Sequence, residues 1–351
     1  MLKSKAAIFK SKKQGIIIDD IFLTEPNKNE VIIKNFYTGL CGSILTNLSR
    51  DPSLPELLGH EGTGKVISKG KNVKHVKVGD EVLISWMPYN ASKDTNYFQW
   101  TNFFYKGKKI NSLIYTLSEY SKLHSQFVSK LPKNIDHKEA SILGCAVISG
   151  YSPVLKNKDL NSKSSVAIIG AGGLGLLALN AAKNKKIKNI TLIENDKTKL
   201  KYGKKFGIKN MVNINDKDFF KIIDKITNNS GFDYIYDFVG KKEIHEKSLS
   251  ILKKSIPGFS TGGTLVIIGL GYDKSEFFSK QLLLNEQTIK GIRGGSVKMK
   301  SDLPKIYKDL KNKKIKMNII ISEVFDFYQI KYAANKLKKG KIFGRAVIKI
   351  N

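Results

Sequence analysis

The sequence predicts an α/β protein of two domains, one built on antiparallel β-structure and one on a doubly wound parallel sheet. At 351 residues the chain is long for one domain and ordinary for two. Short β-type runs separated by turns fill roughly the first 150 residues, whereas strands alternate with helical patterns from Val166 onward. A hydrophobic fraction of 41%, with 29 Gly and 8 Pro, is typical of globular proteins and excludes disordered, collagen-like and membrane-spanning chains.

The β-runs of the first domain are spaced about ten residues apart or slightly more, which favours antiparallel pairing. They cover Glu30–Asn35, Gly64–Ser68 and Asp80–Ser85. The segment Ser92–Lys109 is aromatic and lysine-rich and shows no clear period. We expect it to form a surface lobe held by aromatic packing, with these members: Tyr97, Phe98, Trp100, Phe103, Phe104 and Tyr105.

The second domain alternates strands and helices as a parallel sheet with crossover helices requires. The expected strands cover residues 166–170, 190–194, 233–240 and 263–270. The expected helices cover residues 173–184 and 197–207. After Gly294–Gly295 we expect a helix over Ser301–Asn312, a strand, a last helix and a β-run over Arg345–Ile350.

The net charge of +31 suggests a nucleic-acid partner, but the basic residues do not support one. Only three of the 61 are Arg, and Lys is spread along the whole chain, whereas phosphate-binding grooves also use Arg forks. The N-terminus has no signal-peptide pattern, and no apolar run reaches the ~18 residues of a membrane span. Two Cys make no disulfide scaffold. We expect a cytoplasmic protein with no membrane or nucleic-acid partner.

A glycine-rich motif with its full context predicts a dinucleotide site. It follows a strand and opens a helix, and it consists of Gly170, Ala171, Gly172, Gly173, Leu174 and Gly175. In such a loop the first glycine permits a tight turn, the second lets the backbone approach a pyrophosphate, and the third allows close packing of helix on strand. The helix N-terminus then offers free N–H groups to the phosphates.

An acidic residue ends the second strand of this unit. Glu194 stands nineteen residues after Gly175, where a carboxylate accepts hydrogen bonds from the ribose hydroxyls and repels a 2′-phosphate. This position favours NAD over NADP. Lys197 and Lys199 lie close in sequence and would weaken that discrimination.

Two thiols and one imidazole make up a candidate zinc site. Cys41 and Cys145 are the only cysteines, and His60 precedes Glu61 in a Gly-His-Glu motif. Zinc takes such an S₂N set in tetrahedral geometry and leaves a fourth position for water or substrate in catalytic sites. The spacing alone leaves open two structural cysteines and a loop histidine. The remaining histidines lie in lysine-rich segments and are expected at the surface: His75, His124, His137 and His245.

The chain resembles the zinc-dependent alcohol dehydrogenases of the medium-chain dehydrogenase/reductase superfamily. The resemblance rests on the Gly-His-Glu motif with its downstream glycines, the GDEV turn, the LGCAVISGY segment and the GAGGLG loop, and it runs nearly end to end. It implies a GroES-like domain over residues 1–149 with 294–351, and a Rossmann NAD-binding domain over residues 150–293. It also implies a homodimer or homotetramer.

The resemblance assigns roles to individual residues. Cys41, His60 and Cys145 match the ligands of one catalytic zinc per chain, and Glu61 matches a carboxylate beside that metal. Ser43 matches the hydroxyl that passes on the substrate proton. Further matches are Glu194 and Lys199 at the ribose, Trp86 in the substrate pocket and Arg345 at the pyrophosphate.

Three positions depart from the family pattern. Ile44 replaces the acid that holds the zinc-bound histidine, a loss that typically weakens metal binding or activity by ~10–100-fold. Thr46 replaces the histidine that ends the proton relay in some relatives, and Gly42 replaces a basic residue used at the pyrophosphate. Because Ser92–Lys109 contains no Cys, we expect no structural zinc.

These assignments predict reversible hydride transfer between a primary or secondary alcohol and NAD, with an aldehyde or ketone as the oxidised substrate. A polyol or sugar dehydrogenase is the first alternative, and Cys145 as the third ligand speaks against it. A zinc-free NAD(P)H-dependent reductase is the second, and Ile44 motivates it. A nucleic-acid role would require a steep salt dependence of binding.

Overall fold

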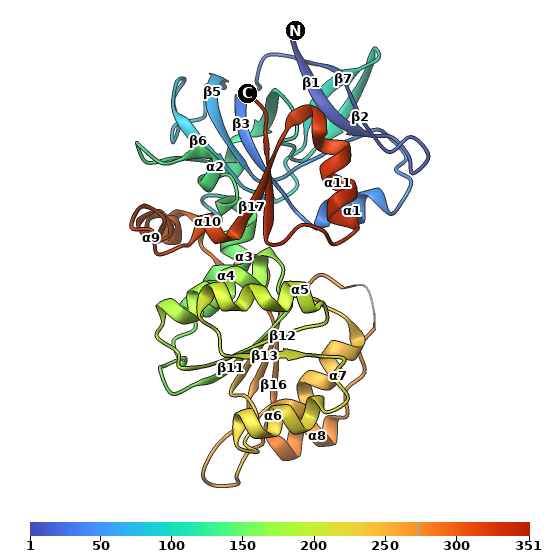
Figure 1. Cartoon of the computed structure of the whole chain (residues 1–351). Coiled ribbons are helices and arrows are strands. Elements are labelled where there is room, and N and C mark those ends of the chain that lie inside the picture. The colour runs from blue at the N-terminus through green and yellow to red at the C-terminus, as the bar shows by residue number, and fades with distance from the viewer. Residues whose placement is uncertain (272–273) are drawn as a thin grey trace. The chain divides into compact units, whose positions relative to one another are not determined.

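The computed structural model describes residues 1–271 and 274–351, which form two compact units (Figure 1). The first unit comprises Met1–Ala146, Lys298–Lys313 and Ile321–Asn351. The second comprises Val147–Val297 and Lys314–Ile320. Residues 314–320 group with the second unit, whereas the sequence analysis assigned residues 294–351 to the first domain.

The first unit is built on two largely antiparallel sheets. One has the order β4-β1-β2-β7-β8, with strands β1 (Leu2–Phe9), β2 (Ile16–Leu23), β4 (Glu56–Leu57), β7 (Thr101–Tyr105) and β8 (Lys108–Ser112). The other has the order β10-β6-β5-β3-β18-β17, with β9 also on β3. Its strands are β3 (Glu30–Leu40), β5 (Gly62–Lys69), β6 (Glu81–Ile84), β9 (Tyr120–His124), β10 (Val128–Lys130), β17 (Ile321–Asp326) and β18 (Arg345–Lys349).

The C-terminal strand completes the second of these sheets. β18 pairs antiparallel with β3, so that Ala346 lies opposite Leu40, the last residue of β3. Both residues are buried in one apolar cluster with Phe325 and Ile348. This pairing brings Arg345 next to the turn that carries Cys41. The remaining helices of the unit are α1 (Ser43–Leu48), α2 (His137–Ala140), α9 (Met299–Lys311) and α11 (Ile330–Lys338).

The second unit confirms the Rossmann prediction. Its six strands are all parallel in the order β13-β12-β11-β14-β15-β16, which is the doubly wound order 3-2-1-4-5-6. The strands are β11 (Ser165–Ile169), β12 (Asn189–Glu194), β13 (Asn210–Asn213), β14 (Tyr234–Asp237), β15 (Thr264–Ile267) and β16 (Thr288–Gly291).

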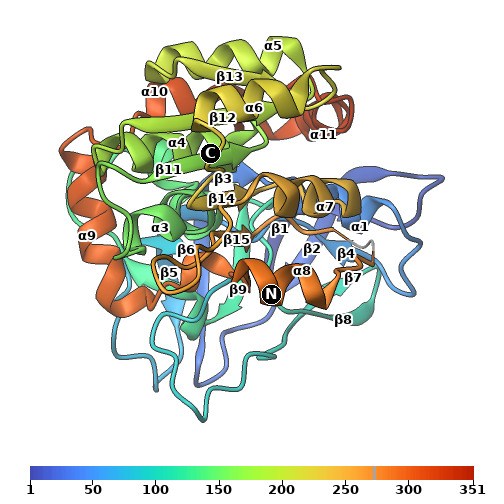
Figure 2. The same cartoon turned by 90° about the horizontal axis from the view of Figure 1, so that it is seen from below.

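Helices cover both faces of this sheet. They are α3 (Ile148–Lys156), α4 (Gly173–Asn184), α5 (Lys197–Leu200), α6 (Phe219–Thr227), α7 (Lys242–Ile251), α8 (Ser279–Asn285) and α10 (Met317–Ile320). Figure 2 views the unit from the side of α6, α7 and α8, which lie in front of the strands. Within the described residues, no helix combines the length and the apolar character needed to cross a membrane.

Two local predictions need correction. The helix expected over residues 197–207 is a short α5 followed by a 3₁₀ helix over Lys201–Phe206. Gly203 packs so closely in this segment that an added Cβ would lie 2.9 Å from the side chain of Leu192.

The second half of the aromatic segment is part of a hairpin that the sequence analysis did not predict, whereas residues 92–100 form no helix or strand. β7 and β8 pair over Thr101–Ser112, so alternate side chains face the core and Phe103 and Tyr105 are buried. Phe98 and Trp100 precede the hairpin and remain 63% and 57% exposed. Their rings stack with centroids 6.5 Å apart.

Candidate active site

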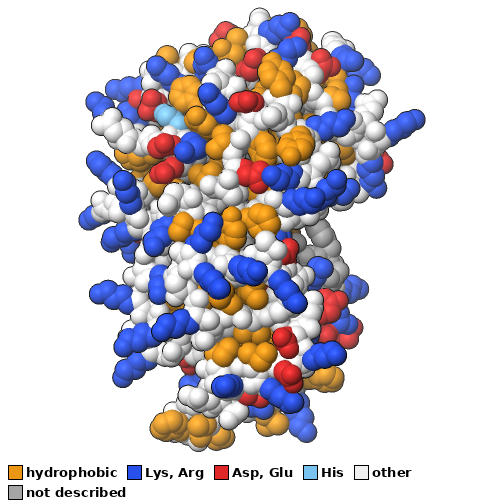
Figure 3. Space-filling view, viewed as in Figure 1, with side chains coloured by type: hydrophobic (Ala, Val, Ile, Leu, Met, Phe, Trp, Pro, Cys, Tyr) orange, Lys and Arg blue, Asp and Glu red, His pale blue; other side chains and the backbone are white. Residues whose placement is uncertain are grey.

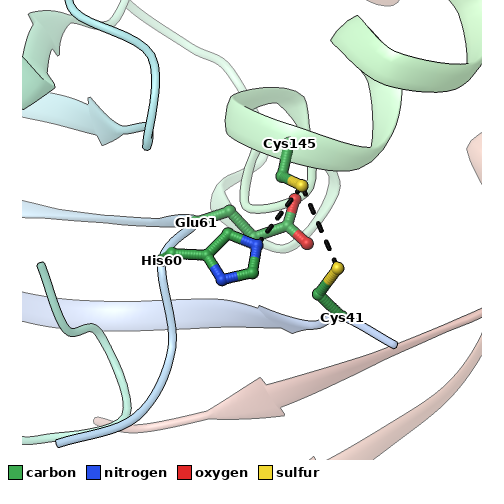
Figure 4. Close-up of side chains that lie close together, drawn as sticks. All are labelled: Cys41, His60, Glu61 and Cys145. Atoms are coloured by element: carbon green, nitrogen blue, oxygen red, sulfur yellow. Dashed lines mark hydrogen bonds between the residues drawn. The ribbon is translucent and has the colours of Figure 1, made fainter. Parts of the chain in front are cut away.

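The predicted metal ligands come together in the first unit (Figure 4). Cys41 follows β3 directly, and His60 and Glu61 precede β5. Cys145 lies in a π-helical turn over Leu143–Val147, a type of turn often found at functional sites. Pairing of β3 with β5 places Thr38 opposite Gly62, which brings the ends of the two strands to one point.

The donor atoms have the spacing that zinc requires. The Sγ atoms of Cys41 and Cys145 are 4.0 Å apart, and His60 Nε2 is 3.3 Å from Cys145 Sγ. Bond lengths of ~2.3 Å to sulfur and ~2.0 Å to nitrogen predict tetrahedral edges of about 3.8 and 3.5 Å. The residues present therefore fit a zinc ion. In the described parts of the chain, this is the one group of three or more His, Cys, Asp or Glu side chains placed to hold a metal.

The fourth member of the cluster, the Glu61 carboxylate, already has partners. The fully buried carboxylate of Glu61 accepts a hydrogen bond from the Ala146 N–H at 3.0 Å and pairs with the guanidinium of Arg345. Gly39 makes room for it, because a Cβ at that position would lie 2.7 Å from the Glu61 carboxyl group. With Glu61 held in this way, the two thiols and the imidazole are the groups that would hold a zinc ion.

The site shifts the pKa values of its own groups. The hydrogen bond from Cys145 and the neighbouring His60 hold the pKa of the Cys41 thiol well below its usual range. The same hydrogen bond, together with burial, raises the pKa of Cys145. Burial raises the pKa of Glu61 to about 6, although Arg345 opposes this. In the metal-free site these opposite shifts make Cys41 the more acidic of the two thiols.

A cavity of about 160 Å³ opens beside Cys41 and His60. Ser43, the first residue of α1, lines this cavity. The other lining side chains are mainly apolar and were missed by the sequence analysis: Ile44, Asn47, Leu57, Leu58, Ile114 and Leu117. Leu57 and Leu58 lie just before the Gly-His-Glu motif, which is the signal that could have identified them. Trp86 is half-buried and is not part of this lining, so its role stays a prediction.

Ile44, which replaces an acidic residue of the family pattern, is part of the apolar core. Its side chain is 6% exposed and packs in the apolar cluster that includes Leu40 and Leu58. This hydrocarbon packing stabilises α1 against the sheet, and it offers no hydrogen bond to an imidazole. The support that the family's acid gives to the histidine is therefore not supplied from this position.

The glycine loop of the second unit has the conformation its motif predicts. Gly170 has φ +97°, a value that L side chains rarely adopt. An added Cβ at Gly175 would lie 1.8 Å from the Gly170 carbonyl oxygen, whereas one at Gly172 would meet nothing within 4 Å. The open space at Gly172, next to the N-terminus of α4, suits the approach of a phosphate.

Glu194 organises this loop. One carboxylate oxygen accepts a hydrogen bond from the Ala171 N–H at 2.7 Å, and the other accepts from the N–H groups of Asn195 and Asp196. The residue thus ties the end of β12 to the turn after β11. Lys199 lies in α5, and its N–H donates to the Asp196 side chain.

Comparisons with known proteins agree with this geometry. The family model for the alcohol dehydrogenase GroES-like domain matches residues 27–133, and the model for zinc-binding dehydrogenases matches residues 173–312. The S-(hydroxymethyl)glutathione dehydrogenase of Haemophilus influenzae is 27% identical over 97% of this chain and 96% of its own. The class-3 alcohol dehydrogenase of Dictyostelium discoideum is 28% identical with the same two coverages.

Solved structures show the same fold. The benzyl alcohol dehydrogenase of Acinetobacter calcoaceticus superimposes with a TM-score of 0.84, at 22% identity and with both chains fully covered. The alcohol dehydrogenase of Aeropyrum pernix gives a TM-score of 0.79 at 22% identity, over 99% of this chain and all of its own.

Together, the two family models cover more than half of the chain, and they match both units of the fold. The chain belongs to the zinc-dependent alcohol dehydrogenase family of medium-chain dehydrogenases. It is an oxidoreductase of the class that acts on CH–OH donors.

Proposed function

We propose that this chain interconverts a primary or secondary alcohol and its aldehyde or ketone with NAD as the hydride carrier. The observation that carries the proposal is the S₂N ligand set of Cys41, His60 and Cys145, with Glu61 paired to Arg345. Such a set with one open position is characteristic of catalytic zinc.

The proposed site holds one zinc ion per chain on these three ligands. Zinc, when bound, is a Lewis acid that lowers the pKa of an alcohol toward neutrality. Ser43 lines the adjoining cavity and is the candidate group to accept the alcohol proton and pass it to solvent. Glu61 fixes the turn that carries Cys145 through its bond to the Ala146 N–H. A second, structural zinc is not proposed, because the chain has no further cysteines.

The cofactor assignments follow from the glycine loop. Gly170, Gly172, Gly173, Leu174 and Gly175 would receive the pyrophosphate at the N-terminus of α4. Glu194 and Lys199 would contact the adenosine ribose, and the acid favours NAD over NADP. Arg345 lies buried against Glu61, so its proposed contact with the pyrophosphate would add to that ion pair.

We propose that the protein is a homodimer or a homotetramer assembled through the second unit. The edge strand β16 is bordered by α8, none of whose residues is buried. Leu283 and Leu284 are 76% and 62% exposed, and Phe278 before them is 83% exposed. Figure 3 shows apolar side chains at the lower end of this face, where Figure 1 places both α8 and the loop between α7 and β15. An edge strand beside such a patch favours sheet extension across a two-fold axis.

Two alternatives remain, one for the substrate and one for the reaction. A polyol or sugar dehydrogenase would need polar groups around the substrate, whereas the lining of the cavity at Cys41 is mainly apolar. A zinc-free reductase would need no ligand set, whereas the three ligands are present at zinc spacing.

A substrate panel tests the proposal. Purified protein would be assayed for NAD and NADP reduction with small primary and secondary alcohols, benzyl alcohol, butanediol, sorbitol and S-(hydroxymethyl)glutathione. We expect NAD reduction by apolar alcohols and weak or no reduction by sorbitol. Reduction of an activated alkene by protein stripped of metal, without turnover of any alcohol, would overturn the proposal in favour of the zinc-free reductase.

A further inference from the structure

A second cavity lies in the first unit and shares no residue with the metal site. It occupies about 590 Å³ between α9 and the loop that follows β10. That volume is within the ~300–1,000 Å³ typical of small-molecule sites. Its lining comprises Tyr89, Ser129, Lys130, Leu131, Pro132, Lys133, Ile135, Lys300, Leu303, Pro304, Tyr307, Lys308, Lys311 and Asn312. We call it the basic groove.

The floor of the groove is apolar. Leu131 and Leu303 are 4% and 1% exposed, and Pro132, Ile135 and Pro304 extend the hydrocarbon surface. The buried hydroxyls of Ser129 and Tyr307 lie 3.5 Å apart and pair with each other, so neither requires a polar group from a ligand. This floor suits an alkyl chain.

The rim of the groove is cationic. Five of its lining residues are Lys, and none is Asp or Glu. Lys130 is paired with Asp80 at 2.6 Å, which leaves the exposed side chains of Lys133, Lys300, Lys308 and Lys311. Like charges around one concave apolar surface repel each other, and the field is focused into the hollow.

The helix α9 places its groove residues on one face. Lys300, Leu303, Tyr307, Lys308 and Lys311 follow the i, i+3, i+4 pattern of a single helical stripe. The two acidic residues of α9 do not line the groove. The Asp302 carboxylate accepts a hydrogen bond from the Lys298 N–H, and Asp309 is buried. The stripe therefore alternates hydrocarbon with positive charge and has no internal counter-ion.

We propose that the basic groove binds a medium-chain alkyl carboxylate. Its chain would lie on Leu131, Leu303 and Pro304, and its carboxylate would meet the lysines of the rim. A neutral alcohol would leave the lysines unpaired, and an alkylammonium ion would be repelled. Because the site lies apart from Cys41, His60 and Cys145, the proposal is independent of the dehydrogenase reaction.

Calorimetric titration of the purified full-length protein with decanoate tests the proposal, with hexanoate and decyltrimethylammonium as comparison ligands. We expect decanoate to bind and hexanoate to bind far more weakly, at about fourfold per CH₂ removed from the apolar floor. We expect decyltrimethylammonium not to bind, and added salt to weaken the binding of decanoate.

A matched pair of variants locates the site. Lys300→Glu/Lys308→Glu reverses two rim charges and should weaken decanoate binding at least tenfold. Lys12→Glu/Lys13→Glu makes the same change of net charge in the β1–β2 turn and should weaken it less than twofold. All four lysines are exposed, so the fold is not at risk.

A carboxylate could also bind a metal, so the titration is repeated on the His60→Ala variant. Unchanged decanoate binding there supports the groove. Loss of binding in His60→Ala, or equal losses in the two lysine pairs, would place the ligand elsewhere and overturn the proposal. Equal binding of decyltrimethylammonium would show that charge plays no part and would overturn it as well.

Discussion

Arg345 and Glu61 are 284 positions apart in the chain and form a buried ion pair beside the metal ligands. β18 delivers the arginine and the β3–β5 pairing delivers the glutamate. Through the bond from the Ala146 N–H to Glu61, the pair also reaches the turn of Cys145. The last residues of the chain thus help to shape a site whose ligands all lie in the first 145.

Removing either member of this ion pair should lower the free energy of unfolding. Glu61→Gln removes the main counter-charge of the buried Arg345 guanidinium and should lower the free energy of unfolding by about 3–5 kcal/mol. Arg345→Met should cost less, because the pKa of Glu61 is already raised to about 6 and the carboxyl group can take up a proton. The double variant Glu61→Gln/Arg345→Met should lose less free energy of unfolding than the sum of the two single variants.

Urea unfolding of the metal-free protein, followed by tryptophan fluorescence, measures these effects. Trp86 and Trp100 both lie in the first unit, so the signal reports on the unit that holds the pair. Strictly additive losses in the double variant would show that the two side chains are not coupled.

The two thiols should differ in reactivity once the metal is removed. Because the pKa of Cys41 is lowered and that of Cys145 is raised, Cys41 should carry the larger thiolate fraction at neutral pH. Iodoacetamide should alkylate Cys41 at least about tenfold faster, since the thiolate is the nucleophile. Mass spectrometry of peptides gives the two rates. The rate at Cys41 should level off at a lower pH than the rate at Cys145; parallel pH profiles would contradict the assignment.

The glycine loop offers a matched pair of substitutions. Gly175→Ala pushes a methyl group against the Gly170 carbonyl and should lower both the melting temperature and the affinity for NADH. Gly172→Ala has open space and should leave the melting temperature unchanged, yet weaken NADH binding where the pyrophosphate approaches. NADH fluorescence titration and thermal unfolding separate the two effects. An unchanged NADH affinity in Gly172→Ala would place the pyrophosphate elsewhere.

The proposed assembly depends on the exposed apolar residues of α8. Leu283→Lys/Leu284→Lys adds charge beside β16 and should convert the oligomer to smaller species in light scattering. Phe220→Lys is the control, because Phe220 is 49% exposed in the same unit but lies in α6. A wild-type protein that is monomeric at micromolar concentration would refute the proposed assembly directly.

Much of this fold could be predicted from the sequence, because short local patterns indicate its strands, helices and turns. The strand–glycine–helix motif at Gly170 predicted the Rossmann unit, and the regular spacing of the β-type runs predicted the antiparallel unit. The meeting of Cys145 with Cys41 could not be derived from spacing, since 104 positions separate them. It came from the family resemblance.

Other features depend on tertiary contacts that no local pattern contains. His245 was expected at the surface, but it is 7% exposed and contacts Asp237 at 3.0 Å and Ser275 at 2.6 Å. The pairing of Glu61 with Arg345 required the register of β18 on β3, which the sequence leaves open. The split of residues 197–207 depends on how closely Gly203 packs against β12.

Zinc content per chain, measured by mass spectrometry together with NAD reduction, tests the central claim most directly. We predict one zinc per chain in the wild type, and loss of both zinc and activity in Cys145→Ala. Ser43→Ala should keep the zinc and lose about 10²–10⁴-fold in turnover, as expected for removal of a proton-transfer group. Wild-type protein that binds NADH but carries no zinc, or a Cys145→Ala variant that keeps full metal and activity, would contradict the account.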